Sequence, residues 1–371
     1  MRNTRFGILS DLFPLLAVAV TIALALFPAW SPDGSPDGVS TTVEAVVGTL
    51  AVLLLCGAAF AAVDHADVVA ERLGQPYGTL VLTFSVTLIE VSVIASMMLH
   101  GDGNPTLARE SVFSVLMIVN TGIIGLCLFL GSLKHREQTV QQQGVSSYLS
   151  VLIALGVMLL ILPSETHDGA TGQFSPFQLA FMASVAVGLY ATFLYMQTVR
   201  YTEHFTAQEP EHEAHKPTLA QLVRAVVMLL VSLAGVVGLS HTVATSFEDF
   251  LSLFPLADPD AVTGALVALL LLLPESISAV KAAGRNHLQH SINISLGSAL
   301  ATTALTIPTM AAISMYLGLP MVLGLDPEDR TQLLLVFVLC ILSFGTGRTN
   351  ALNGAVHLIL FFVYVMLTFV P

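Results

Sequence analysis

The chain has 371 residues, of which 55% are hydrophobic and only 10% charged, and its formal net charge is −12. Soluble domains carry about 25% charged residues, so this composition excludes a soluble enzyme, a nucleic-acid-binding domain and a disordered protein. The excess of acidic over basic residues also argues against a nucleic acid as a partner.

Eleven apolar stretches are candidates for bilayer-spanning helices, which need about 20 residues each. They are unbroken runs rich in Leu, Val and Ala, without the period-two alternation of membrane barrel strands. The sequence therefore predicts an all-α polytopic membrane protein with about eleven transmembrane helices. The tenth stretch is short, which leaves ten spans as an alternative. In chain order the stretches are Leu12–Trp30, Val43–Val63, Tyr77–Leu99, Ser111–Gly131, Val145–Leu162, Phe174–Val199, Leu219–His241, Ala261–Ala283, Ser291–Tyr316, Thr331–Phe344 and Ala351–Val370.

One acidic segment divides the chain. Residues 201–217 contain four glutamates and three histidines, namely Glu203, His204, Glu209, Glu211, His212, Glu213 and His215. The predicted organisation is an extra N-terminal helix (1–40), a five-helix repeat (41–200), this acidic loop (201–217) and a second five-helix repeat (218–371). Because five is odd, the two repeats have inverted orientations. The loop is either a solvated tether or a segment that concentrates cations and senses pH through its histidines.

The basic residues predict the orientation. If the N-terminus is cytoplasmic and there are eleven spans, every Lys and Arg except Arg109 and Arg330 lies on the cytoplasmic side. Lys and Arg are retained on that side of membranes. We therefore expect a cytoplasmic N-terminus and an external C-terminus.

Two glutamates lie inside predicted spans. Glu90 is near the middle of the third span and Glu275 near the middle of the eighth. Carboxylates within spans are rare and mark ion or proton sites by default. Thr83 and Thr87 share a helix face with Glu90, and Ser278 follows Glu275 by one turn. The alternative is a pair of carboxyl groups that are protonated or hydrogen-bonded for packing.

Further polar residues accompany these acids. The ninth span carries a stripe of hydroxyls, Ser291, Ser295, Ser298 and Thr302, with Asn293 and Gly297 on a neighbouring face; the fourth span offers Ser114 and Asn120. A single Ser or Thr often bonds a carbonyl of its own helix, but a whole stripe favours a site.

Pro274 precedes the second glutamate. A proline lacks an N–H group, so the Leu270 carbonyl has no donor one turn later. A free carbonyl beside the Glu275 carboxylate suits a hard cation such as Ca²⁺, which takes 6–8 oxygen ligands. The other interpretation is an ordinary kink in a membrane helix.

Two segments resemble a known family. LLPESISAVKAAGRNHLQHSINISLGSALATTALTIP resembles the second α-repeat of the Ca²⁺/cation antiporter superfamily, and GTLVLTFSVTLIEVSVIASMML with ARESVFSVLMIVNTG resembles the first. The match is closest to bacterial ChaA-type calcium/proton antiporters. The resemblance implies a bacterial inner-membrane location and assigns the family's two essential acids to Glu90 and Glu275. It assigns the family's Gly-Ser to Gly297 and Ser298, and its asparagine to Asn120.

The chain departs from plant and Bacillus-type relatives near the second acid. Where those have Gly-Asn-Ala, this chain has Leu272, Leu273 and Pro274; their histidine is Ser276 and their glutamine Ala301. These changes bear on ion selectivity more than on the exchange mechanism.

The predicted function is therefore export of Ca²⁺ in exchange for H⁺, with Glu90 and Glu275 binding cation or protons in turn. A Na⁺(K⁺)/H⁺ antiporter on the same fold and a cation channel remain alternatives. The chain shows no hydrolytic signature, so it is not expected to be an enzyme. Its expected partners are inorganic cations, protons and the lipid bilayer, with no nucleic acid and no resident cofactor. The oligomeric state is left open.

Overall fold

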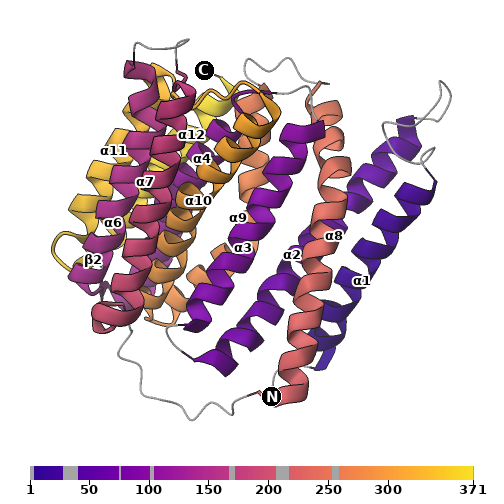
Figure 1. Cartoon of the computed structure of the whole chain (residues 1–371). Helices are drawn as coiled ribbons and strands as arrows, with labels where there is room; N and C mark the ends of the chain where they lie inside the picture. The colour runs from indigo at the N-terminus through magenta and orange to yellow at the C-terminus, as the bar shows by residue number, and fades with distance from the viewer. Residues whose placement is uncertain are drawn as a thin grey trace. The chain divides into compact units, whose positions relative to one another are not determined.

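The computed structural model describes residues 4–27, 41–74, 77–100, 104–166, 172–205, 217–252 and 259–370. Nearly all of them are helical (Figure 1). The first seven helices are α1 (Thr4–Leu26), α2 (Thr41–Leu73), α3 (Tyr77–His100), α4 (Leu107–Met117), α5 (Ile124–His135), α6 (Gln142–Gly156) and α7 (Pro176–Tyr195). The other five are α8 (Leu219–Ser252), α9 (Pro259–Gly284), α10 (Leu288–Leu317), α11 (Pro327–Phe344) and α12 (Ala351–Phe369).

Several of these helices join into longer rods. A π-helical turn, η3 (Ile118–Ile123), connects α4 to α5, and α6 and α7 are extended by η4 (Val157–Ile161) and η6 (Met196–Arg200). The described residues thus form eleven rods, one for each predicted span. Eight of them are long and apolar enough to cross a membrane, and α1 and α3 hold shorter apolar segments. The prediction of an all-α polytopic membrane protein is confirmed.

Two helices are longer than their apolar stretches. α2 has 33 residues and α8 has 34, which corresponds to about 50 Å at 1.5 Å per residue. The hydrocarbon core is only about 30 Å thick. Hydropathy marks only the apolar part of α2, whereas the helix itself continues through charged residues to Arg72 in its last turn.

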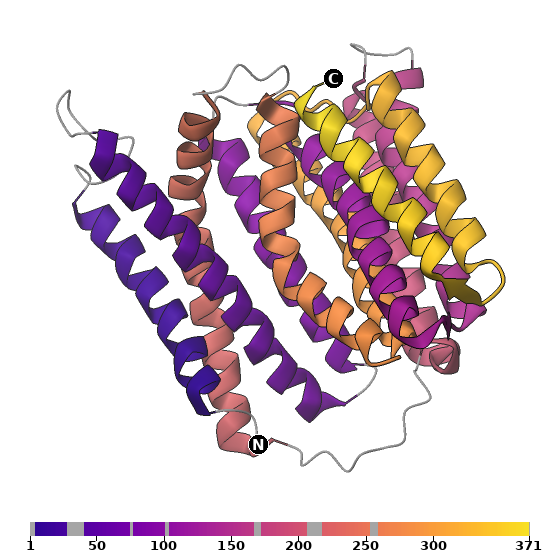
Figure 2. The ribbon, with the colours of Figure 1, turned by 180° about the vertical axis from the view of Figure 1, so that it is seen from behind.

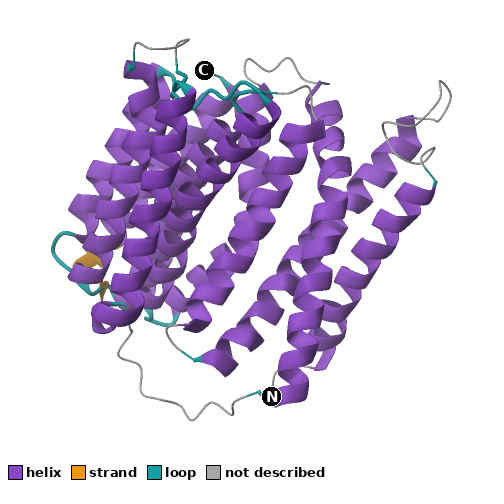
Figure 3. Ribbon diagram, in the orientation of Figure 1, coloured by secondary structure: helices purple, strands orange, loops and turns teal. Residues whose placement is uncertain are grey.

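A two-stranded sheet was not expected from the sequence. β1 (Glu137–Thr139) follows α5, β2 (Arg348–Asn350) precedes α12, and the two pair antiparallel with Gln138 opposite Thr349 (Figure 3). Both of those central side chains are buried. Strands of three residues are too short to produce a recognisable alternation, so sequence periodicity could not reveal them.

The chain forms two compact units. Unit 1 comprises Met1–Asn104 and Glu211–Pro259, and unit 2 comprises Pro105–Pro210 and Asp260–Pro371. Unit 1 therefore contains α1, α2, α3 and α8, and unit 2 contains α4 to α7 and α9 to α12. Each unit takes helices from both halves of the sequence, as expected when two repeats intertwine. The division at residues 40, 200 and 217 stays a prediction.

In unit 1, α2 packs against α1, α3 and α8. Small residues allow this: a Cβ atom on Gly48 of α2 would lie 2.8 Å from the Cβ of Ser246, and one on Gly235 of α8 would lie 2.8 Å from the Cβ of Ala17. Small residues are typical of close helix contacts in membranes. Polar contacts also join α1 to its neighbours, because Asp11 pairs with Arg224 of α8.

In unit 2, α10 is the central helix and packs against α4, α6 and α7. The α4–α5 rod is the most enclosed candidate span, with 89% of its most apolar window buried. α12 lies along α5 and η3, as seen from behind in Figure 2. This arrangement places the glutamate of α9, the hydroxyl stripe of α10 and the asparagine of η3 in one unit.

Candidate cation and proton site

Glu275 lies on α9, which runs through Pro274 without a break. Its side chain is buried, at 7% exposure, although α9 is an otherwise apolar helix. Leu270, whose carbonyl the proline leaves without its usual donor, is half-buried, whereas Ser278 is exposed. Ser278 was predicted to lie beside Glu275 on the same helix. Its side chain is in fact more exposed than the Glu275 carboxylate.

Ser298 of α10 is the partner that the structure brings to Glu275. Its side chain is buried at 4% exposure and interacts with the Glu275 carboxyl group. Within the described residues, however, Ser298 Oγ and Glu275 Oε2 complete no hydrogen bond of good geometry. A buried polar atom without a partner costs about 1–3 kcal/mol. Two such oxygens side by side favour a ligand that binds both of them.

Ser295, one turn earlier on the α10 stripe, behaves differently. All four hydroxyls are buried, but Ser295 Oγ donates to the Ser291 carbonyl at 3.0 Å, which is the ordinary bond within a helix. Gly297 faces the Tyr148 hydroxyl, which would lie 3.7 Å from a Cβ atom there. That is a normal van der Waals distance, so packing alone does not demand a glycine at this position.

Asn293 belongs to a separate network. Its Nδ2 donates to the Phe205 carbonyl at 2.6 Å, and its Oδ1 accepts from Gln289 Nε2 at 2.9 Å. Gln289 Oε1 in turn accepts from the Gln141 backbone at 2.7 Å. Both ends of the Asn293 amide are therefore used to join α10 to neighbouring loops of unit 2.

Asn120 lies in the π-helical turn η3 and is completely buried. Its Nδ2 donates to the Leu116 carbonyl at 2.8 Å, and its Oδ1 is 3.5 Å from the Cys340 thiol. π-helical turns are rare and often occur at functional sites. Asn120 lies in the same unit as Glu275 and Ser298. The three side chains carry amide, carboxylate and hydroxyl oxygens, which are the ligand types that hard cations prefer.

Unit 1 holds the other predicted acid. Glu90 is buried at 1% exposure on α3, next to buried Thr87 and half-buried Thr83. Thr87 Oγ1 donates to the Thr83 carbonyl at 2.9 Å, so its proton is used within the helix while its lone pairs can still face a cation. The buried environment of Glu90 agrees with a carboxylate held inside a span.

The sequence did not single out two other buried ionisable residues. His357 of α12 is fully buried and contacts the Asn120 carbonyl; a lone histidine within an apolar run was the available signal. Glu110 at the start of α4 is buried at 2% exposure and pairs with Arg109, whose Nε lies 2.6 Å from Glu110 Oε1. Because Arg109 neutralises it, Glu110 is a poor cation ligand.

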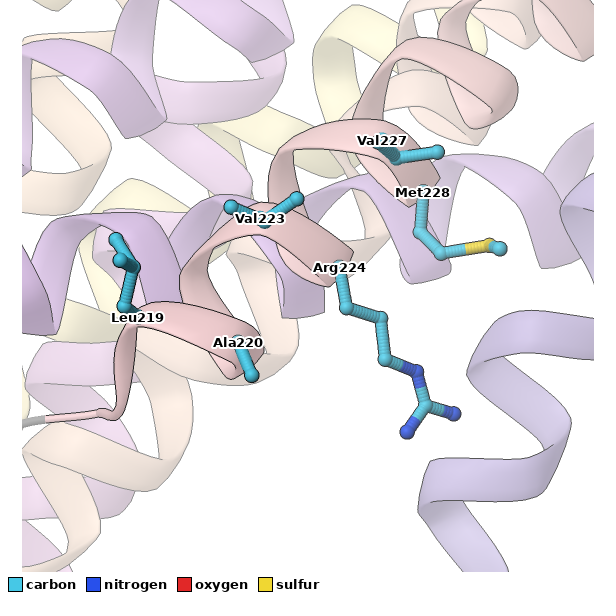
Figure 4. Close-up of a pocket in the computed structure, with 6 residues that line it drawn as sticks. All are labelled: Leu219, Ala220, Val223, Arg224, Val227 and Met228. Atoms are coloured by element: carbon cyan, nitrogen blue, oxygen red, sulfur yellow. The ribbon is translucent and has the colours of Figure 1, made fainter.

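An open groove on the surface of α8 differs chemically from the site around Glu275. It is lined by Leu219, Ala220, Val223, Arg224, Val227 and Met228 (Figure 4). The lining offers no oxygen-bearing side chain, and its one charged member, Arg224, pairs with Asp11. This surface therefore lacks the ligands that a cation needs.

The acidic loop is only partly within the described residues. Glu203 and His204 lie in a short 3₁₀ turn, η7 (Thr202–His204), with their side chains 4.0 Å apart and that of Glu203 86% exposed. Glu209, Glu211, His212, Glu213 and His215 lie outside the described residues.

The sequence is similar to those of known transporters. The model of the sodium/calcium exchanger protein family matches residues 43–199 and 224–370, and these two matches cover most of the chain. The chain is 43% identical over 325 residues to an ionic transporter of Sinorhizobium fredii named y4hA, covering 86% of this chain and 87% of that protein. It is 36% identical over 375 residues to the sodium-potassium/proton antiporter ChaA of Escherichia coli, covering 99% and 98%.

The fold agrees with a solved structure from the same group of transporters. The structure of native YfkE, a Ca²⁺/H⁺ antiporter protein, covers 98% of this chain and 100% of its own, with a TM-score of 0.74 and 17% identity. Two inverted five-helix repeats with an extra N-terminal helix fit this fold. These relatives are transporters and not enzymes. The chain belongs to the sodium/calcium exchanger protein family, and within it resembles the ChaA-type antiporters.

Proposed function

We propose that this chain exports Ca²⁺ across the bacterial inner membrane in exchange for protons. The observation that carries the proposal is the Glu275 carboxylate, which is buried inside an apolar helix beside a Ser298 hydroxyl without completing its hydrogen bonds. Such a group needs a partner, and a cation or a proton supplies one. The family and its antiporter members support the same conclusion.

Each carboxylate of the pair, Glu90 and Glu275, binds cation or proton but not both at once. Loading with Ca²⁺ or with protons neutralises the negative charge, and only a neutral site crosses a dry intermediate at low cost. Further oxygen ligands come from the side chains of Asn120, Ser298 and Thr87. Gly297 leaves room for these ligands. Rocking of one group of helices against the other then exposes the loaded site to alternate sides.

The proposed membrane arrangement follows from charge and repeats. The N-terminus is cytoplasmic and the C-terminus external, residues 41–200 and 218–371 form the inverted repeats, and residues 201–217 connect them in the cytoplasm. The two separate matches to the family model, over 43–199 and 224–370, support this division.

A Na⁺(K⁺)/H⁺ antiporter is the second candidate. The Escherichia coli relative that aligns over 99% of this chain is a sodium-potassium/proton antiporter. One protonated glutamate with hydroxyl oxygens would suit a monovalent cation, whereas two ionised glutamates favour a divalent one.

Purified protein in proteoliposomes separates these candidates. An imposed pH gradient should drive uptake of radioactive calcium, and uptake should stop when the gradient is collapsed. Uptake of radioactive sodium with no calcium uptake would establish the second candidate. Uptake of either ion at the same rate without a pH gradient would indicate a channel and contradict exchange.

We expect the apparent KM for Ca²⁺ to rise as pH falls on the cation-binding side, because protons and Ca²⁺ compete for the same carboxylates. If one proton competes, the rise approaches about tenfold per pH unit. The measurement is initial calcium uptake against concentration at four pH values, with the pH of the opposite side fixed. An apparent KM that does not change with pH would contradict competition.

Ser298→Ala should raise the apparent KM for Ca²⁺ about tenfold, because it removes the hydroxyl that faces Glu275. Ser295→Ala is the matched control, since Ser295 lies on the same helix and bonds only the Ser291 carbonyl in the described contacts; its KM should change less than about twofold. Calcium uptake by both variants in proteoliposomes checks this. Equal effects would show that the stripe lines a pathway and that Ser298 has no special role.

A further inference from the structure

His357 is held at both ring nitrogens. Its Nδ1 lies 2.6 Å from the Asn120 carbonyl oxygen and its Nε2 lies 3.0 Å from Ser343 Oγ. A carbonyl oxygen can only accept, so Nδ1 carries the hydrogen and donates it to Asn120. In the neutral ring Nε2 then accepts the hydrogen of the Ser343 hydroxyl. The ring is completely buried between α11 and η3, so it has one orientation.

The π-helical turn changes the backbone hydrogen bonds at Asn120. In a regular α-helix the carbonyl of Asn120 would accept from the Ile124 N–H group, four residues later. Here the Ile124 N–H group bonds the carbonyls of Val119 and Thr121 instead. The imidazole thus donates to a carbonyl that has lost its regular α-helical donor, at the residue whose side chain is a proposed ligand.

Glycines let α12 come close enough for this bond. A Cβ atom on Gly125 would lie 3.1 Å from the Cβ of His357, and one on Gly122 would lie 3.1 Å from the Phe361 ring. On the α12 side, a Cβ atom on Gly354 would lie 2.7 Å from the Cα of Phe129. These glycines allow the backbones of α12 and the α4–α5 rod to pack close together (Figure 2).

We propose that His357 is a positioning residue that fixes Asn120 for cation binding by anchoring its backbone carbonyl. The inference rests on the proposed role of Asn120 as a ligand. The anchored π turn fixes the direction of the Asn120 side chain, whose Nδ2 is already engaged by the Leu116 carbonyl. Its Oδ1 then has one defined position, and its partner among the described residues is the weak thiol donor of Cys340 at 3.5 Å. Without the anchor, the turn can relax and the oxygen moves.

Two substitutions of His357 separate positioning from simple packing. Asparagine places an amide donor where Nδ1 lies, whereas glutamine places its amide near the position of Nε2 and loses the bond to Asn120. In pH-driven calcium uptake, His357→Gln should raise the apparent KM for Ca²⁺ about five- to tenfold while the maximal rate changes less than about twofold. His357→Asn should stay within about twofold of the unmodified KM.

Two further variants make the test specific. Ser343→Ala removes the contact at Nε2 and keeps the bond to Asn120, so its KM should change less than about twofold. In an Asn120→Ala background, His357→Gln should add nothing to the KM, because residues that act through one another are not additive. A purely structural histidine would give the same loss in both backgrounds.

Equal KM increases for His357→Gln and His357→Asn would overturn the inference, as would an undiminished effect in the Asn120→Ala background. If Asn120→Ala itself leaves the KM unchanged, the proposed ligand role of Asn120 fails instead, which is a different result. Should His357→Gln not insert, Gly125→Ala tests the same point, since it retains His357 but pushes its Cβ away. An unchanged KM in that variant would also contradict the inference.

Discussion

Glu275→Gln will abolish cation/proton exchange while the protein stays folded and inserted. Glutamine has nearly the volume of glutamate but cannot carry the negative charge that binds Ca²⁺, and it cannot release and rebind a proton. We expect the rate of pH-driven calcium uptake to fall by a factor of about a hundred or more, since the carboxylate takes part in every step. Glu90→Gln should have the same effect, because each acid is proposed to bind both substrates.

The control is Glu165→Gln, which neutralises a carboxylate whose side chain is 62% exposed and pairs with Arg330. Exposed ion pairs contribute only about 0–1 kcal/mol, so this variant should transport at close to the normal rate. Each protein is reconstituted in equal amount after size-exclusion chromatography shows a single folded peak. Exchange at a near-normal rate by either Glu90→Gln or Glu275→Gln would remove that residue from the shared site.

The number of helical rods could be predicted from hydrophobicity, because the bilayer requires each membrane-crossing segment to be apolar. Any segment that crosses the hydrocarbon must satisfy its backbone internally and be about 20 residues long, so eleven apolar runs become eleven rods. The same signal says nothing about where a helix ends in water, and α2 accordingly continues to Leu73, well beyond the predicted Val63. It also cannot reveal the π turn at Asn120, since a single widened turn leaves the apolar pattern almost unchanged.

Parts of the site could be predicted for a similar reason. Glu90 and Glu275 are conspicuous because a carboxylate inside a span is costly, and the stripe on α10 led to Ser298. The family resemblance singled out Ser298 through its Gly-Ser pair. Spacing alone could not distinguish Ser298, which faces Glu275, from Ser295, which bonds its own helix. The contact between His357 and Asn120 joins residues 237 positions apart, and no local pattern encodes such a contact.

Arg109 is a basic residue whose burial could not be predicted from the distribution of charges along the sequence. The predicted orientation places Arg109 and Arg330 on the external side, away from the other basic residues. In the structure Arg109 is buried at 7% exposure. It binds Glu110 through Nε at 2.6 Å, the Gly324 carbonyl at 2.7 Å and Asp326 at 3.3 Å. The guanidinium thus connects the start of α4 to the segment before α11.

Arg109→Ala should therefore destabilise the protein strongly. It leaves the Glu110 carboxylate buried without its principal counter-ion, and breaking a buried pair from one side costs about 3–5 kcal/mol. For a chain of this size we expect the Tm in detergent to fall by about 4–6 °C. The first turn of α4 contains Glu110, and the positive end of the helix dipole compensates only part of the loss.

Arg330→Ala is the matched control, because Arg330 pairs with the 62%-exposed Glu165; its Tm should change by less than about 2 °C. Replacing both buried charges by apolar residues of similar size, as in Arg109→Met with Glu110→Leu, should recover most of the Tm lost in Arg109→Ala, since no unpaired charge remains. Thermal unfolding of the four proteins followed by intrinsic fluorescence measures these shifts. If the double variant is as unstable as Arg109→Ala, the buried charge of Glu110 is not the cause of the instability. The bonds from Arg109 to the Gly324 carbonyl and to Asp326 would then be what holds the start of α4 in place.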